Sequence, residues 1–304
     1  MLAVLRQRNF GLLWTAGLVS YIGDWVLLTV LPVFVYERTR STLASGLVLL
    51  MYAIATLLMG SIAGVFVDRW DRRRTLIRIN LLQAVLLPFL LLALHDAWWW
   101  VVYPVAFLEG VFYAFLYPAE NALLPRLVGE QHLMTANALN SLNDNLARII
   151  GPAIGGLILA QANLAAAVIV DAVSYLLAAL LIAGITAPGR AEEPSLGADA
   201  RDATPEHIWA RVWHEWVDGV RLIRTTPLLR ALFLGIAVAA LADTLNSPLI
   251  VPFVLNVVGA DPSAIGLLFA GQGVAGLLGS VLVARYGARF VPSRLLGWSM
   301  IAVA

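Results

Sequence analysis

Apolar residues fill most of the chain in long runs that short polar or charged segments separate. A helix needs about 20 mainly apolar residues to cross the hydrocarbon core of a bilayer, and these runs reach that length. The pattern predicts membrane-spanning helices at 11–34, 44–67, 76–94, 98–118, 141–160, 163–186, 228–254 and 263–284, and a ninth that begins near Leu295 and contains the end of the chain. The predicted fold class is therefore an all-α polytopic membrane protein.

Composition supports this interpretation and narrows the chemistry. Of the 304 residues, 61% are hydrophobic and 13% are charged, whereas soluble domains carry about 25% charged residues. The chain has no cysteine and only four scattered histidines, so we expect no disulfide, no metal site and no cofactor. It also lacks a phosphate-binding loop and the HExxH and GxSxG motifs, which argues against an enzyme.

Charge clusters in the stretch "GVFVDRWDRRRTL" at 64–76, between two apolar runs. A basic cluster can bind nucleic acid, but spanning helices flank this one closely, so we expect no nucleic-acid partner. Arginines concentrate in alternate connections, which places the N-terminus and residues 68–75 in the cytoplasm by the positive-inside rule.

Residues 187–226 differ from the other connections because they are long and polar. The first part has linker composition. The part "IWARVWHEWVDGVRLI" repeats apolar residues at helical spacing and predicts an amphipathic helix. Its apolar face would lie on the membrane surface or pack on protein, and the pattern leaves both open.

The two halves of the chain resemble each other. "GSIAGVFVDRWDRRR" at 60–74 matches "GLLGSVLVARYGARF" at 276–290, so that Arg69 falls on Arg285. Parallel six-helix repeats joined by a cytoplasmic loop are one known transporter architecture. We therefore expect a complete six-helix domain at 1–186, a linker at 187–227 and an incomplete second bundle at 228–304.

The helix 2–3 stretch resembles the signature of the major facilitator superfamily, a Gly, then Asp-Arg, then a basic pair. The matching residues are Gly64, Asp68, Arg69, Arg72 and Arg73, and Asp71 stands where the family has Gly. The resemblance implies that this loop is a conformational latch on the cytoplasmic side, in which Asp68 caps the turn. The alternative is that the charges only determine topology.

A second resemblance lies in helices 4 and 5. "YPAENALLPRLV" at 117–128 and "ANALNSLNDNLARIIGPAIGG" at 136–156 resemble the enterobactin-exporter-like branch, which includes macrolide-efflux proteins. Four residues resemble the antiporter motif of helix 5, which in the family packs against a helix of the second half: Gly151, Pro152, Gly155 and Gly156.

Acidic residues inside predicted spans are the best candidates for function, because charge in a bilayer is costly. Asp24 and Asp243 lie in the middle of helices 1 and 7, Glu109 near the middle of helix 4 and Asp171 in helix 6. Each could carry a proton or bind a cationic substrate, or could simply hydrogen-bond a neighbouring helix. Tyr113 and Asn246 are further polar candidates for the lining of a cavity.

The resemblance implies a secondary active transporter that works by alternating access. The predicted activity is proton-driven export of amphiphilic small molecules, drugs or a siderophore, with protons and lipid as the other partners. The expected state is a monomer in the bacterial inner membrane. The alternatives are a facilitator or importer of the same fold, and an incomplete fragment or scaffold that does not transport.

Overall fold

The computed structural model describes residues 2–161, 163–186, 217, 221–227, 229–231, 233–235, 249–261 and 263–286. Contacts divide the chain into two units, one of Met1–Arg190 with Pro248–Ser280 and one of Ala191–Ser247 with Val281–Ala304. In the second unit the described residues form short helical pieces, such as 221–225. The predicted amphipathic helix lies mostly outside the described residues.

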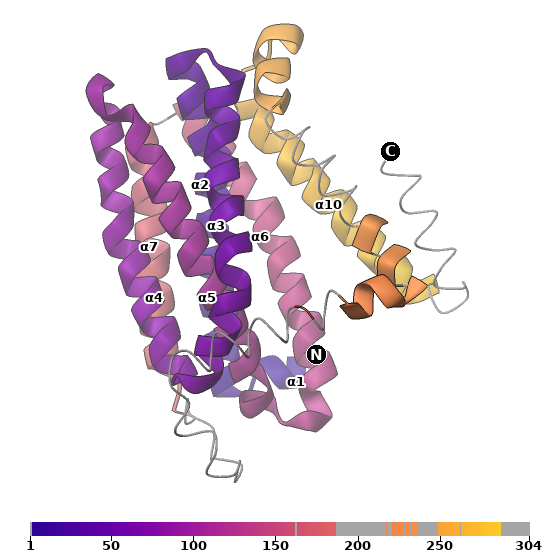
Figure 1. Cartoon of the computed structure of the whole chain (residues 1–304). Coiled ribbons are helices and arrows are strands. Elements are labelled where there is room, and N and C mark those ends of the chain that lie inside the picture. Colours follow the sequence, from indigo (N-terminus) through magenta and orange to yellow (C-terminus); the bar gives the residue numbers. More distant parts are fainter. Residues whose placement is uncertain are drawn as a thin grey trace. The chain divides into compact units, whose positions relative to one another are not determined.

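Long helices build the first unit (Figure 1). They are α2 (Arg8–Thr39), α3 (Thr42–Arg69), α4 (Arg72–Leu86), α5 (Val102–Val128), α6 (Leu133–Gln161), α7 (Leu164–Ala183) and, as far as Ser280, α10 (Ser263–Tyr286). Shorter elements are the helix α1 (Leu2–Leu5), the 3-10 helices η1 (Leu87–Leu94), η2 (Asp96–Val101) and η3 (Glu130–His132), and the π-helix η5 (Phe253–Val258). The described part of the chain is all-α, as predicted.

Among the described residues, five segments are long and apolar enough to cross a membrane: Arg8–Thr39, Thr42–Gly60, Arg72–Leu94, Asp96–Val128 and Leu164–Ala183. Helix α6 is equally long but is not among them, because polar residues fill its first half. Those residues contribute bonds between helices. Asn143 donates from Nδ2 to the carbonyl oxygen of Trp14 at 2.8 Å, and the Trp14 indole donates to the carbonyl oxygen of Leu139 at 2.8 Å.

Several helices extend beyond the apolar runs that predicted them. The spans predicted at 98–118 and 141–160 implied a long non-helical connection between them. In the structure α5 continues to Val128 and α6 already begins at Leu133. Pro118 and Pro125 lie inside α5 without ending it. The predicted helix ends were wrong there because an apolar run shows only where a segment leaves the bilayer core. The backbone hydrogen bonds of the helix continue into the polar residues that follow.

The cap of α4 is also different from the predicted one. Helix α3 runs through Asp68 to Arg69, and the residue that precedes α4 is Asp71. Its Oδ1 accepts a hydrogen bond from the backbone N–H of Arg74 at 2.8 Å. Aspartate is among the preferred residues at a helix N-terminus because its carboxylate satisfies a free N–H there. The departure from the family's Gly at position 71 therefore supplies the cap.

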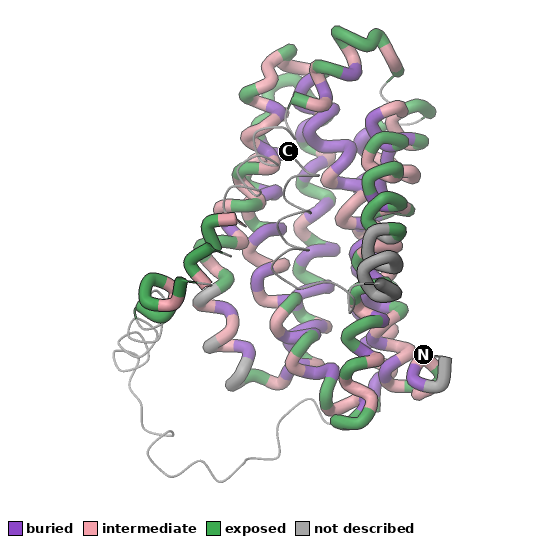
Figure 2. The backbone as a smooth tube through the Cα atoms, turned by 90° about the vertical axis from the view of Figure 1, so that its right-hand side faces the viewer, coloured by how far each residue is buried: buried purple, intermediate pink, exposed green. Residues whose placement is uncertain are grey.

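Helix α2 is central in the first unit. It packs along α6 and α7 and also contacts α3, while α3 packs along α5 and α4 packs between α5 and α7. Buried residues lie on the faces that meet, and exposed residues lie outside (Figure 2). Leu57, Val85 and Leu180 are exposed. Such apolar exposure is expected of surfaces that face lipid rather than water.

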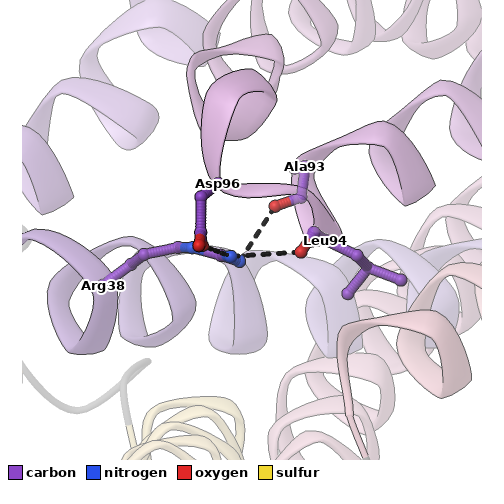
Figure 3. A network of polar contacts seen from close by, with 4 residues as sticks. All are labelled: Arg38, Ala93, Leu94 and Asp96. Carbon is purple, nitrogen blue, oxygen red and sulfur yellow. Dashed lines mark hydrogen bonds and ion pairs between the residues drawn. The ribbon is translucent and has the colours of Figure 1, made fainter.

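Arg38 joins the end of α2 to the turn between η1 and η2 (Figure 3). Its guanidinium donates to the carbonyl oxygens of Ala93 at 3.0 Å and Leu94 at 3.1 Å and pairs with the carboxylate of Asp96. The planar fork of arginine suits such multiple contacts. The Asp96 side chain is 96% exposed, so water can take its place beside the Arg38 guanidinium. Removal of Arg38, in contrast, takes a charged donor away from both carbonyl oxygens.

We expect Arg38→Ala to destabilise the bundle by about 1–2 kcal/mol, because both carbonyls lose a donor. The matched control is Asp96→Ala, which removes only an exposed ion pair and should have little effect. Thermal unfolding of the purified protein in detergent measures both. Equal loss in the two variants would contradict a role for the carbonyl bonds.

Candidate functional site

The acidic residues predicted on three separate helices line one cavity of the first unit. Asp24 of α2, Glu109 of α5 and Asp171 of α7 all face it. Glu109 is 7% exposed and Asp171 1% exposed. Gln83 of α4 and Tyr175 of α7 complete the polar group. Four helices therefore bring their polar side chains to the same place inside an otherwise apolar bundle.

The Tyr175 hydroxyl is the centre of the hydrogen bonds. It contacts Oδ1 of Asp24 and lies 2.9 Å from Oε2 of Glu109. The Gln83 side-chain amide donates from Nε2 to Oε2 of Glu109 at 2.7 Å and to the Tyr175 hydroxyl oxygen at 2.6 Å. One phenol thus contacts two carboxyl groups, those of Asp24 and Glu109, which are 85 positions apart in the sequence.

Counting protons in this group gives a chemical constraint. A tyrosine hydroxyl has one hydrogen to donate, and its contacts include two carboxyl groups. If Tyr175 donates to one of them, the other must donate to Tyr175, and only a protonated carboxyl can do so. Two separate hydrogen bonds, as opposed to one hydroxyl hydrogen shared between both oxygens, therefore need a proton on Asp24 or Glu109.

Asp171 lies beside this group. Its Oδ1 is 3.1 Å from the Ser174 hydroxyl, and its Oδ2 is buried with no partner among the described residues. Gly23 makes the close approach possible, because a Cβ atom at that position would collide with the Asp171 carboxylate and the Ser174 hydroxyl. A glycine next to Asp24 thus lets α7 bring a further carboxyl to the cavity.

The cavity walls are mainly apolar and aromatic. Leu27, Leu31 and Val48 line it, together with the phenol rings of Tyr52 and Tyr113. The two rings are 5.9 Å apart between centroids. The cavity volume is about 30 Å³, which leaves room for about one or two water molecules and is far below the usual size of small-molecule sites. Tyr113 therefore lies where the sequence predicted a cavity-lining group.

The structure describes the side chains of only some residues of the predicted latch. Gly64 lies in α3, and a Cβ there would meet nothing within 4 Å. Asp68 and Arg69 end α3, but their side chains lie outside the described part. Arg72 begins α4 and is buried. The Arg73 guanidinium donates to the carbonyl oxygens of Ile182, at 3.3 Å, and Ala183 at the end of α7.

The glycines of the predicted antiporter motif lie at helix contacts. A Cβ at Gly151 would collide with Trp25 of α2, and one at Gly155 would lie 3.1 Å from Thr29 of the same helix. At Gly156 a Cβ would lie 3.0 Å from the Cα of Gly266 in α10. This face of α6 therefore approaches both α2 and a helix of the second half. Asp243 and Asn246 lie outside the described residues.

The sequence as a whole matches one family model. The model of the Major Facilitator Superfamily covers residues 13–238, most of the chain. The chain belongs to the Major Facilitator Superfamily. The superfamily consists of multi-pass membrane transporters, a class that is not enzymatic, and the described residues include helices long and apolar enough to cross a membrane.

Relatives within the superfamily are distant. The uncharacterized MFS-type transporter YfiS of Bacillus subtilis is 23% identical over 97% of this chain and 67% of its own length. Macrolide efflux protein A of Streptococcus pyogenes is 25% identical over 75% of this chain and 54% of its own length. Enterobactin exporter EntS of Shigella boydii is 30% identical over 51% of this chain and 38% of its own length. The chain thus spans from about two fifths to two thirds of these relatives.

A solved structure of the superfamily has the same fold. It is a bacterial homolog of the human lysosomal transporter Spinster, in an inward-facing and unoccupied conformation. The TM-score is 0.65 at 17% identity, over 94% of this chain and 64% of that one. This likeness supports the all-α membrane fold of the superfamily.

The sequence analysis did not predict two members of the polar group, Gln83 and Tyr175. Both had a signal in the sequence. Gln83 is one of two amides, with Asn80, inside the apolar run 79–94. Tyr175 follows Asp171 by four residues and so shares its helix face. Glu120, buried near the other end of α5, was also missed, because the predicted helix 4 ended at 118.

Proposed function

We propose that this member of the Major Facilitator Superfamily exports amphiphilic small molecules, drugs or a siderophore, in exchange for protons. The observation that carries the proposal is the buried group of Tyr175, Asp24 and Glu109, in which a proton on one carboxyl completes two separate carboxyl–phenol hydrogen bonds. Burial disfavours the charged form of a carboxyl group. Such a group can bind a proton in one conformation and release it when water enters the cavity.

The cavity next to these carboxyl groups is too small for a substrate in this conformation, but its lining would suit an amphiphilic molecule in a conformation in which alternating access widens it. Its aromatic and aliphatic walls would bury the apolar part of the molecule, and its few polar groups would orient the rest. Two relatives are named for macrolide efflux and enterobactin export, which favours export as the direction. A facilitator or importer of the same fold is the alternative, and a chain that does not transport is another.

The proposed organisation is a six-helix domain at 1–186, a cytoplasmic linker at 187–227 and a second, partial bundle at 228–304. Alternating access would then move the two bundles against each other. The contact of Gly156 in α6 with Gly266 in α10 is a place where a helix of the first half meets one of the second half. A monomer is the proposed working form, with substrate, protons and lipid as its partners.

Transport into everted membrane vesicles tests the function. The complete gene product is expressed in a host, and a panel of macrolides, siderophores and cationic dyes is supplied outside the vesicles. We expect accumulation of at least one compound when a proton gradient is present and its loss when an ionophore removes the gradient. Accumulation that is the same with and without the proton gradient would contradict proton exchange. Accumulation in right-side-out vesicles only would favour an importer.

The proposed location is the inner membrane of a bacterium, with the N-terminus in the cytoplasm. The native chain has no cysteine, so single cysteines report on topology cleanly. Arg74→Cys replaces a side chain that is 76% exposed at one end of the bundle. Asp96→Cys replaces one that is 96% exposed at the other end.

We expect an impermeant maleimide to label Asp96→Cys from outside intact cells and to leave Arg74→Cys unlabelled until the cells are opened. The reason is that arginine-rich connections remain on the cytoplasmic side. The exposed Asp96 position is the positive control for reagent access. Labelling of Arg74→Cys in intact cells would reverse the proposed orientation.

A further inference from the structure

Helix α5 carries a second buried carboxyl group, apart from the cavity. Glu120 is 4% exposed and follows Glu109 by eleven residues. At about 100° per residue, eleven residues make three turns and return to nearly the same face. The Tyr21 hydroxyl of α2 donates to Oε2 of Glu120 at 2.6 Å, and Nδ2 of Asn140 of α6 lies 3.4 Å from Oε1. Three helices thus meet at this carboxyl.

The arrangement repeats the one around Glu109. In each place a carboxyl of α5 contacts a phenol, Tyr175 for Glu109 and Tyr21 for Glu120. Helix α2 supplies residues to both, because Tyr21 and Asp24 are one turn apart. The two places form successive layers along α5, and Tyr113, which lines the cavity, lies between them in the sequence.

Charge near Glu120 does not favour its ionised form. The titratable groups that act on it or on its partner are Tyr21 of α2, Asp144 of α6 and Tyr113 of α5. None of them is a cation, and the described residues give Glu120 no ion pair. The Arg148 guanidinium of α6 lies over the Trp25 ring, 5.2 Å from its centroid, and its charge acts on Asp144. A buried carboxylate without a cation is costly.

The hydrogen-bond partners fit both states of the carboxyl. As the carboxylate, Glu120 accepts from Tyr21 and Asn140. The Oδ1 atom of Asn140 is buried and has no partner among the described residues. A half-turn of this amide would therefore present Oδ1 as an acceptor for a protonated Glu120 without breaking another bond of that atom. A backbone carbonyl or an arginine in place of Asn140 could not serve both states.

We propose that Glu120 is a second proton-binding site of the six-helix domain, between the cavity carboxyls and the end of the bundle that carries the arginine-rich turn. A proton from the aqueous phase at that end adds to a carboxylate oxygen of Glu120, and the carboxylic acid later returns it. The inference extends the proposed proton exchange. Its test reads the proton directly, so it does not depend on transport.

The measurement is infrared difference spectroscopy of the purified complete gene product in nanodiscs, titrated from about pH 4 to about pH 10. We expect the parent to show a carboxyl C=O band that disappears as pH rises, and Glu120→Gln to lack that component. Glu130→Gln is the matched control, because Glu130 is exposed at the same end, and it should retain the band. A spectrum of Glu120→Gln identical to that of the parent at every pH would overturn the inference.

A second variant decides the matter if Glu120→Gln does not fold. Tyr21→Phe keeps the carboxyl and the ring but removes a donor that stabilises the charged form. We expect the midpoint of the band to move up by about one pH unit, the usual effect of one hydrogen bond to a charged group. An unmoved midpoint would contradict the site. The Glu120 band could titrate in a protein whose transport does not depend on a proton gradient. That result would refute the proposed function and would still support this inference.

Discussion

Glu109→Gln and Asp24→Asn should each abolish uphill transport and leave downhill exchange of substrate intact. An amide keeps the size of the carboxyl group but cannot take up and release a proton in this pH range. The cavity would remain, because Gln83 and Tyr175 still hold the helices together at this place. In energised vesicles we expect accumulation to fall to the level seen without a proton gradient.

Two controls separate coupling from folding in this experiment. Glu37→Gln changes an exposed acid on the same helix as Asp24 and should transport like the parent. Tyr175→Phe keeps the ring but removes the hydroxyl that joins the two carboxyls, so it should weaken coupling without removing either carboxyl. Loss of folded yield and of both transport modes together would indicate a structural role. Uphill transport equal to that of the parent in both carboxyl variants would refute these residues as the proton carriers.

The second large effect is expected at the contact between α6 and α10. Gly266→Leu would place a Cβ 2.6 Å from the Cα of Gly156 and against the carbonyl oxygen of Pro152. Both neighbours are backbone atoms, so the helices must separate. Overpacking of this kind costs about 1–3 kcal/mol or more. We expect a marked loss of folded protein, or transport near background in the protein that remains.

Gly271→Leu is the matched control for Gly266→Leu. Both glycines lie in α10, but a Cβ at Gly271 meets nothing within 4 Å. The same substitution there changes helix propensity and volume equally and should leave yield and transport near the parent's. Equal effects of the two variants, measured by size-exclusion yield and vesicle uptake, would show that the Gly156–Gly266 approach is not needed.

The sequence alone was sufficient for the class of the protein and for most of its helices. Apolar runs locate helices because transfer of side chains and backbone from water to lipid depends on local composition and length. The same reasoning singled out Asp24, Glu109 and Asp171 as candidates, since a charged group inside an apolar run is rare and costly. The boundaries of α5 and α6 were missed because backbone hydrogen bonds continue after the apolar run has ended.

Only the tertiary structure decided which of these residues meet. The rotation of each helix about its axis, and the close approaches at Gly23 and Gly156, depend on packing between segments far apart in the sequence. Packing therefore joined Asp24 to Glu109 through Tyr175, and buried Glu120 against Tyr21. It also directed Arg73 to the end of α7. Hydropathy places a residue at a depth in the membrane, whereas its partners depend on contacts that no single run of sequence contains.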